Sequence, residues 1–100
     1  MREAQIILSN VSPFATTALR VRLRDTFGGY TQHIASGVWR DPATNIVHDD
    51  INHVFTVAAE LPDLAMAKLR EIAREAGRAS NQVCVYLKGF DGEVEFVACG

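Results

Sequence analysis

Histidines and aspartates in one stretch of this 100-residue chain have the residue types needed for acid–base chemistry. His33, His48 and His53 fall in one predicted hairpin, together with Asp49 and Asp50. Imidazole titrates near neutral pH, so two adjacent histidines would serve as acid and base in metal-independent phosphodiester cleavage. On a regular strand, however, His48 and His53 point to opposite faces. The competing interpretation is that all three are surface and rim histidines on a long hairpin.

A second set of residues combines glycine, aromatic and arginine side chains, which suits the binding of a small anionic ligand: Gly28, Gly29, Tyr30, Thr31, Trp39 and Arg40. Two glycines let the backbone approach a ligand closely. Tyr30 or Trp39 would stack on a base, and Arg40 would face a phosphate. The structural alternative is a helix cap and tight turn, with Trp39 closing the edge of a sheet. The glycines follow a predicted helix and lack a Lys-Ser/Thr ending, so they form no known phosphate-binding loop.

The hydrophobic pattern predicts the elements that position these residues. A first helix begins with the N-cap Ser12 and Pro13, and Gly28 is its stop signal. A second helix begins at Pro62 and ends near Gly77. Strands are predicted at residues 5–8, 30–40, 46–59, 82–88 and 93–97, with a bulge or kink at Ser36-Gly37 as one possibility.

This order of elements predicts a single α+β domain over residues 1–100, with a ferredoxin-like βαββαβ sandwich and an extra C-terminal strand. We expect the core face of the sheet to carry Phe55, Val57, Val83, Val85 and Leu87. The opposite face would carry Val54, Thr56, Ala58, Cys84 and Tyr86, joined by Trp39 if Gly37 does not shift the register. That face is too apolar to lie fully in water, so it is either a surface between copies of the chain or the floor of a ligand site.

Composition narrows the function classes. Apolar residues make up 48% and charged residues 22%, which is typical of a globular domain. The net charge of −2 excludes a protein that binds polynucleotides non-specifically through a broad basic surface. The sequence shows no membrane-spanning run and no secretory signal pattern, so we expect a cytoplasmic location.

The two cysteines carry no further chemistry in this interpretation. We expect Cys84 to be a small packed hydrophobe and Cys99 to be frayed at the chain end. Neither has a partner at metal-ligand spacing, so no zinc site is predicted. The His and Asp side chains of the hairpin could collect a divalent metal, but the interpretation as surface histidines is favoured, so no metal site is predicted and no cofactor is expected.

Three motifs in this order resemble a family of small, mostly uncharacterised phage and bacterial proteins. The motifs are Gly28-Gly29-Tyr30-Thr31, then Gly37-Val38-Trp39-Arg40, then a late Gln82-Val83-Cys84-Val85. The resemblance covers roughly residues 23–97. Where the family places a glutamate after the hairpin turn, this chain has His48-Asp49-Asp50. The resemblance implies a compact α+β fold and a phage setting, hence the cytoplasm of a bacterial host.

Three functional hypotheses follow. The first is an anti-defence binder, a homo-oligomer (dimer or larger) that sequesters a small anionic ligand such as a cyclic nucleotide. Such a site would be shared between copies, because one small domain offers little depth. The second is a phosphodiesterase that uses His33 with His48 or His53. The third is a protein that blocks a host defence component through an edge strand or the open sheet face.

Overall fold

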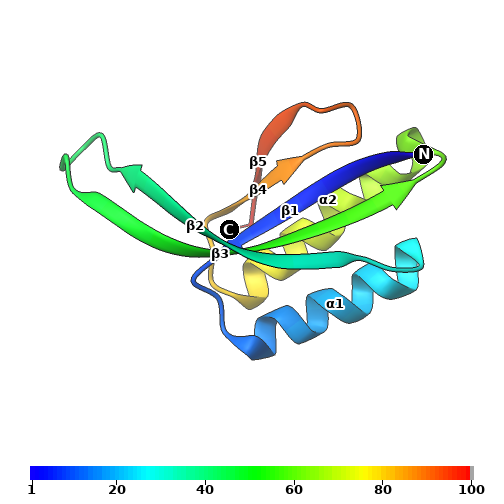
Figure 1. The fold of residues 1–100 in the computed structure, drawn as a ribbon, viewed down its shortest axis with the longest axis horizontal. Helices are drawn as coiled ribbons and strands as arrows, with labels where there is room; N and C mark the ends of the chain where they lie inside the picture. The colour runs from blue at the N-terminus through cyan, green and yellow to red at the C-terminus, as the bar shows by residue number, and fades with distance from the viewer. Residues whose placement is uncertain (100) are drawn as a thin grey trace.

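The computed structural model describes residues 1–99 as five strands and two helices. In chain order they are β1 (Arg2–Ser9), α1 (Pro13–Phe27), β2 (Thr31–Arg40), β3 (Val47–Ala59), α2 (Pro62–Ala79), β4 (Cys84–Lys88) and β5 (Val94–Ala98). The strands form one antiparallel sheet in the order β2-β3-β1-β4-β5 (Figure 1). This is the predicted ferredoxin-like arrangement, with β5 added beside β4.

Local sequence signals set the ends of α1. The Ser12 hydroxyl accepts a hydrogen bond from the Ala15 backbone N–H, and Pro13 occupies the first turn. Gly28 follows the helix with φ 84°, and its N–H donates to the Arg24 carbonyl at 2.8 Å. A residue with a Cβ is disfavoured in this left-handed conformation, so the glycine stop signal is confirmed.

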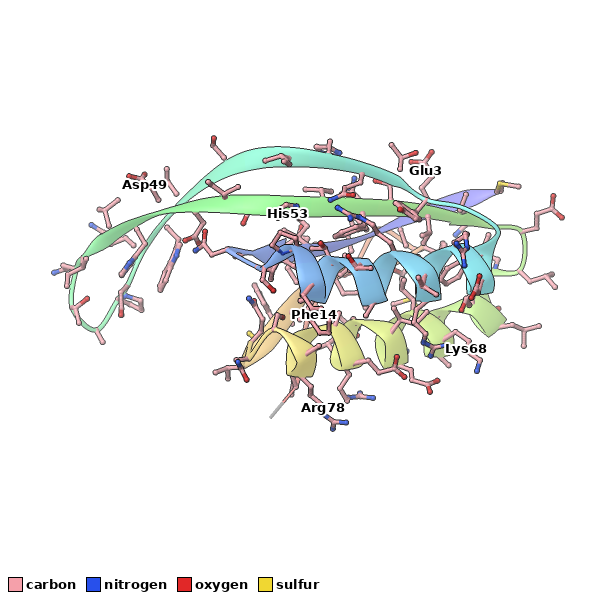
Figure 2. The ribbon with its side chains drawn as sticks, turned by 90° about the horizontal axis from the view of Figure 1, so that it is seen from below. Glu3, Phe14, Asp49, His53, Lys68 and Arg78 are labelled. Carbon is pink, nitrogen blue, oxygen red and sulfur yellow. The ribbon has the colours of Figure 1, made fainter. Side chains whose placement is uncertain are left out.

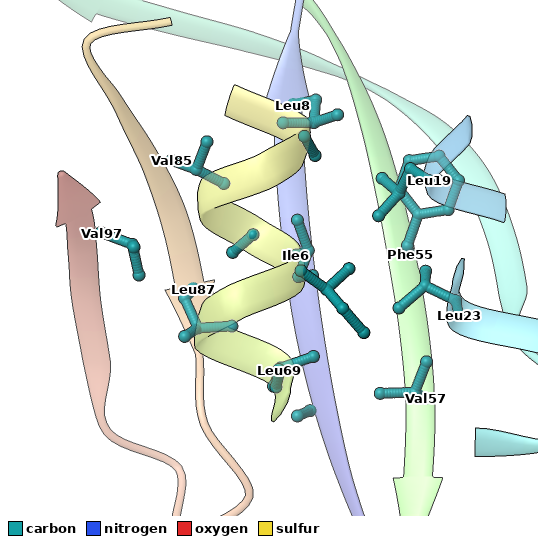
Figure 3. Packing of buried hydrophobic residues seen from close by; sticks show 14 of the residues in the cluster. Ile6, Leu8, Leu19, Leu23, Phe55, Val57, Leu69, Val85, Leu87 and Val97 are labelled. Atoms are coloured by element: carbon teal, nitrogen blue, oxygen red, sulfur yellow. The ribbon is translucent and has the colours of Figure 1, made fainter. Parts of the chain in front are cut away.

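Both helices pack on one face of the sheet and bury the core between the two layers (Figures 2 and 3). Phe55 and Leu87 from the sheet belong to the same buried cluster as Leu69 from α2, and all three are 0% exposed. Burial of each such side chain contributes about 1.5–3 kcal/mol to stability. One predicted core residue was wrong: Val83 is 84% exposed, because β4 begins only at Cys84.

The β2–β3 hairpin is longer than the helices that support the sheet. Its outer part, residues 36–51, projects past the ends of both helices, and we call this segment the arm (Figures 1 and 2). The arm contains no bulge, because β2 and β3 pair residue by residue from Thr31 to Arg40. Gly37 instead makes room for a neighbour: a Cβ there would collide with the carboxamide of Asn52.

Both cysteine expectations were wrong. Cys84 is exposed on the helix-free face, whereas Cys99 is buried at 3% exposure. The Cys99 N–H donates to the Val83 carbonyl at 2.9 Å, which extends the β4–β5 pairing to this residue. Gly77 lies in the last turn of α2, near the helix end as predicted, and a Cβ on it would collide with the Cys99 sulfur. The glycine therefore permits close contact between α2 and the C-terminal strand.

Candidate functional site

A groove of about 390 Å³ lies on the helix-free face of the sheet, at the root of the arm. Register places Trp39 on this face opposite His48, and Gly37 on it opposite Asp50. Three aromatic side chains from three strands line the groove: Trp39, Tyr86 and Phe96. The prediction that Trp39 and Tyr86 share this face is confirmed, because the register continues unbroken through Gly37.

The aromatic rings of the groove are arranged in pairs. The Trp39 indole stacks on the His48 imidazole with centroids 4.6 Å apart and planes 18° apart. Tyr86 and Phe96 meet edge to face at 5.9 Å and 82°. Trp39 remains 48% exposed and Phe96 68% exposed, so both offer apolar surface to a ligand or to another chain.

A second hollow of about 350 Å³ contains the double glycine at the other end of β2. Gly28, Gly29, Tyr30 and Thr31 all line it. The Tyr30 ring is half-buried and packs against Phe55 with centroids 6.1 Å apart. Gly28 also caps α1, so this stretch has the structural role that was one of the two alternatives, while still bordering a hollow surface.

The predicted ligand-binding residues do not converge within one chain. Thr31 and Trp39 stand at opposite ends of β2, about 26 Å apart for an extended strand. Arg40 pairs with Val47 and therefore points to the opposite face from Trp39. A single ligand in the groove thus meets Trp39 without Arg40, and the glycine turn is out of its reach.

The three candidate catalytic histidines are also separated. His33 lies on the helix-free face opposite Val54, about 20 Å along β2 from the position facing His48. His53 lies on the helix-covered face, as the alternation along the strand predicts (Figure 2). Within one chain no two of them are placed to act as an acid–base pair. Among residues 1–99, no group of three or more His, Cys, Asp or Glu side chains is placed to hold a metal.

Hydrogen bonds to Gln32 determine the tautomer of His53. The Arg20 Nε–H donates to Gln32 Oε1 at 2.9 Å, which leaves the Gln32 amide N–H groups facing His53 Nδ1 at 3.2 Å. An arginine side chain has donors and no acceptor, so the Gln32 oxygen must face Arg20 and the Gln32 nitrogen must face His53. Nδ1 therefore accepts and Nε2 carries the hydrogen. This anchors the root of the arm to α1.

Ion pairs account for several helix arginines. Arg22 Nε donates to Glu75 at 2.9 Å and joins the two helices, and this bond raises the pKa of Arg22. Arg70 Nε donates to Glu95 at 2.7 Å, which likewise raises the pKa of Arg70. Both pairs are partly exposed, so they contribute little to stability.

Sequence reasoning did not identify Asp50, Asn52 or Phe96 as ligand-binding residues, although all three line the groove. The signal for Asn52 and Asp50 was their alternation with Asp49 and Ile51 along β3. That these residues lie near β4 and β5 depends on the strand order, which cannot be predicted from a local sequence pattern.

No family model matches the sequence, and no curated protein matches it. Two solved structures do match. The fold is similar to that of a phage SAM lyase. The structure of that lyase in complex with S-methyl-5′-thioadenosine has a TM-score of 0.71 at 12% identity, covering 96% of this chain and 88% of the lyase chain.

The second structure is a phage SAM lyase in its apo state, with a TM-score of 0.64 at 13% identity over 96% of this chain and 87% of that one. At this identity, the two likenesses establish the fold. Separately, neither helix within residues 1–99 is long and apolar enough to cross a membrane.

Proposed function

We propose that this chain is a homo-oligomeric phage protein that acts against host defence by handling a sulfur-bearing adenosine of the SAM class. The aromatic groove on the helix-free face carries this proposal, because it lies in a fold similar to that of a phage SAM lyase. Trp39, Tyr86 and Phe96 offer faces and edges for stacking an adenine ring. A volume of about 390 Å³ is within the usual range of small-molecule sites.

The ligand class in this proposal differs from the phosphate-bearing nucleotide expected from sequence. That expectation relied on Arg40 acting beside Trp39, whereas the two point to opposite faces of β2. The phosphodiesterase alternative likewise loses its basis within one chain, because His33, His48 and His53 lie apart. The two candidate activities are binding of SAM and cleavage of SAM, the second because the similar structures are those of a lyase.

The exposure of this same face supports the proposal of an oligomer. The groove is open along its length, and Phe96 is 68% exposed beside it. Packing helix-free faces together would remove this apolar surface from water. In this proposed oligomer the Trp39 groove of one copy lies near the glycine hollow of another, so that the two halves of the predicted site form one pocket. The protein would act in the cytoplasm of a bacterial host.

The test is incubation of the purified protein with SAM, followed by denaturation and chromatography of the released small molecules. Retention of intact SAM supports a sequestering protein, and release of S-methyl-5′-thioadenosine supports a lyase. Trp39→Ala should weaken either activity at least tenfold, whereas Leu64→Ala, an exposed apolar residue on α2, should change neither. The proposal fails if SAM is neither retained nor converted. In that case, capture of a host protein would favour the protein-blocking alternative.

A further inference from the structure

The charged and polar groups of the groove are unusual for a nucleotide site. Among its lining residues, all within the described part of the chain, Asp50 is the one charged side chain. The lining includes neither lysine nor arginine. A phosphate in this groove would therefore meet a carboxylate and no cation, which is unfavourable for an anion.

Asp50 is held in place by Asn10, the residue that follows β1. The Asn10 side-chain amide donates to Asp50 Oδ1 at 2.9 Å. Asn10 also clasps the β3 backbone: its N–H donates to the Ile51 carbonyl at 2.8 Å, and its Oδ1 accepts from the Ile51 N–H at 3.0 Å. Its φ of 52° brings these groups to the strand. One carboxylate oxygen of Asp50 is thereby engaged by Asn10, and the Asp50 side chain lines the groove.

Asn52 supplies the complementary group on the same face. The Ser9 hydroxyl donates to Asn52 Oδ1 at 2.7 Å, so the Asn52 amide N–H groups are the part left for a ligand. That amide lies over Gly37, where any side chain on residue 37 would displace it. The groove thus presents an acceptor at Asp50 and a donor at Asn52 between aromatic walls.

We infer that Asp50 makes this groove select adenosines that are neutral or cationic at the 5′ position and reject those that carry a phosphate. The inference rests on the proposed function, since it concerns the ligand of the same site. A cation gains from the Asp50 carboxylate and from the aromatic faces around it. A 5′-phosphate meets like charge, and at an effective dielectric near that of a protein surface we expect a loss of about tenfold or more in affinity.

Three stable ligands with the same adenosine core test this selectivity: 5′-methylthioadenosine (neutral), 5′-amino-5′-deoxyadenosine (cationic) and AMP (anionic). Calorimetric titration should show that the first two bind and that AMP binds at least tenfold more weakly. Asp50→Asn should lower the ratio of the affinity for 5′-methylthioadenosine to the affinity for AMP by about tenfold. The matched control is Asp49→Asn, since Asp49 is the neighbouring carboxylate on the opposite face of β3 and should leave this affinity ratio unchanged.

A second variant keeps the selectivity testable if Asp50→Asn does not fold. Asn10→Gly keeps the positive φ at residue 10 and the charge of Asp50, but it removes the side chain that holds the carboxylate. This variant should lower the same affinity ratio by less than Asp50→Asn does. The selectivity is wrong if all three ligands bind equally well, or if the affinity ratio is unchanged in both Asp50→Asn and Asn10→Gly. Either result leaves the proposed function unaffected. Absence of binding by 5′-methylthioadenosine and its amino analogue defeats the proposed function, and the selectivity with it.

Discussion

Trp39 lies stacked on His48 across the β2–β3 pair, with ring centroids 4.6 Å apart. The two rings face each other one residue pair before the end of the β2–β3 ladder, so they stiffen the outer part of the arm, which carries one wall of the groove. Both predicted site residues thus have a structural contact with each other, which neither the catalytic nor the stacking hypothesis had assumed.

Removal of the imidazole should expose the indole. Trp39 is the one tryptophan of the chain, so its fluorescence reports on this contact alone. We expect His48→Ala to shift the emission to longer wavelength and to cost about 0.5–1.5 kcal/mol of stability, the range for an aromatic pair. His33→Ala, on the same face but opposite Val54, is the control. Identical spectra for both variants would contradict the stacked arrangement.

A charge on the helix-free face should disrupt the oligomer. Light scattering of the wild type should give a multiple of the 11.0 kDa chain mass. Phe96→Glu should lower that mass, because a carboxylate would be buried between copies. Phe14→Glu should not, since Phe14 is 85% exposed but lies on α1. A wild type of 11.0 kDa at micromolar concentration would rule out the proposed association.

Whether Gly77→Ala raises or lowers the free energy of unfolding tests the packing of α2. In an isolated helix, Gly→Ala stabilises by about 1 kcal/mol. Here we expect Gly77→Ala to destabilise by about 1–3 kcal/mol, because the new methyl group would collide with Cys99 and Val85. Gly29→Ala, with open space around it, should stay within about 0.5 kcal/mol. Urea unfolding of both variants measures the difference, and a stabilised Gly77→Ala would show that α2 and β5 are not in close contact.

Alkaline pH should weaken the fold through Cys99. Burial is the main cause that raises the pKa of this thiol, with a smaller contribution from Cys84 and opposing ones from Arg78 and Arg74. In the unfolded chain the thiol ionises at about pH 8.5, while the folded chain keeps its proton to higher pH. Between the two pKa values the folded state binds more protons than the unfolded state. The contribution of Cys99 to stability is therefore fully present below the unfolded pKa and is lost as pH rises through the folded pKa.

The measurement is urea unfolding from pH 7 to pH 10 for the wild type and for Cys99→Ala. The wild type should lose stability faster with pH than the variant, since only the wild type has the thiol to ionise. Cys84→Ala serves as the control, because Cys84 is exposed. Equal slopes for wild type and Cys99→Ala would contradict a protonated, buried thiol.

Much of the fold was predictable because its signals are local. Ser12, Pro13 and Gly28 act on the backbone within one or two turns, so they mark α1 without reference to the rest of the chain. The alternation along residues 46–59 likewise separates the two faces of β3, since side chains on a strand alternate regardless of their partners. The order of these elements then favoured the ferredoxin-like arrangement, which the strand order confirms.

The site was less predictable because its members meet through pairing between distant strands. Trp39 and Arg40 are adjacent in sequence, yet the pleat sends them to opposite faces. A bulge or kink at Ser36-Gly37 was one possible interpretation of the sequence, whereas the missing side chain of Gly37 makes room for Asn52 on the neighbouring strand. Cys99 looked frayed, but pairing with Val83 and contact with Gly77 bury it.

The sequence by itself determined the succession of helices and strands, because caps, turns and hydrophobic periods act over a few residues. Only the tertiary structure decided that Trp39 faces Tyr86, Phe96 and Asp50, and that the glycine turn lies at the far end of the same strand. The physical reason is that strand order and register are set by the packing of the whole sheet, and these relations determine which side chains share a groove.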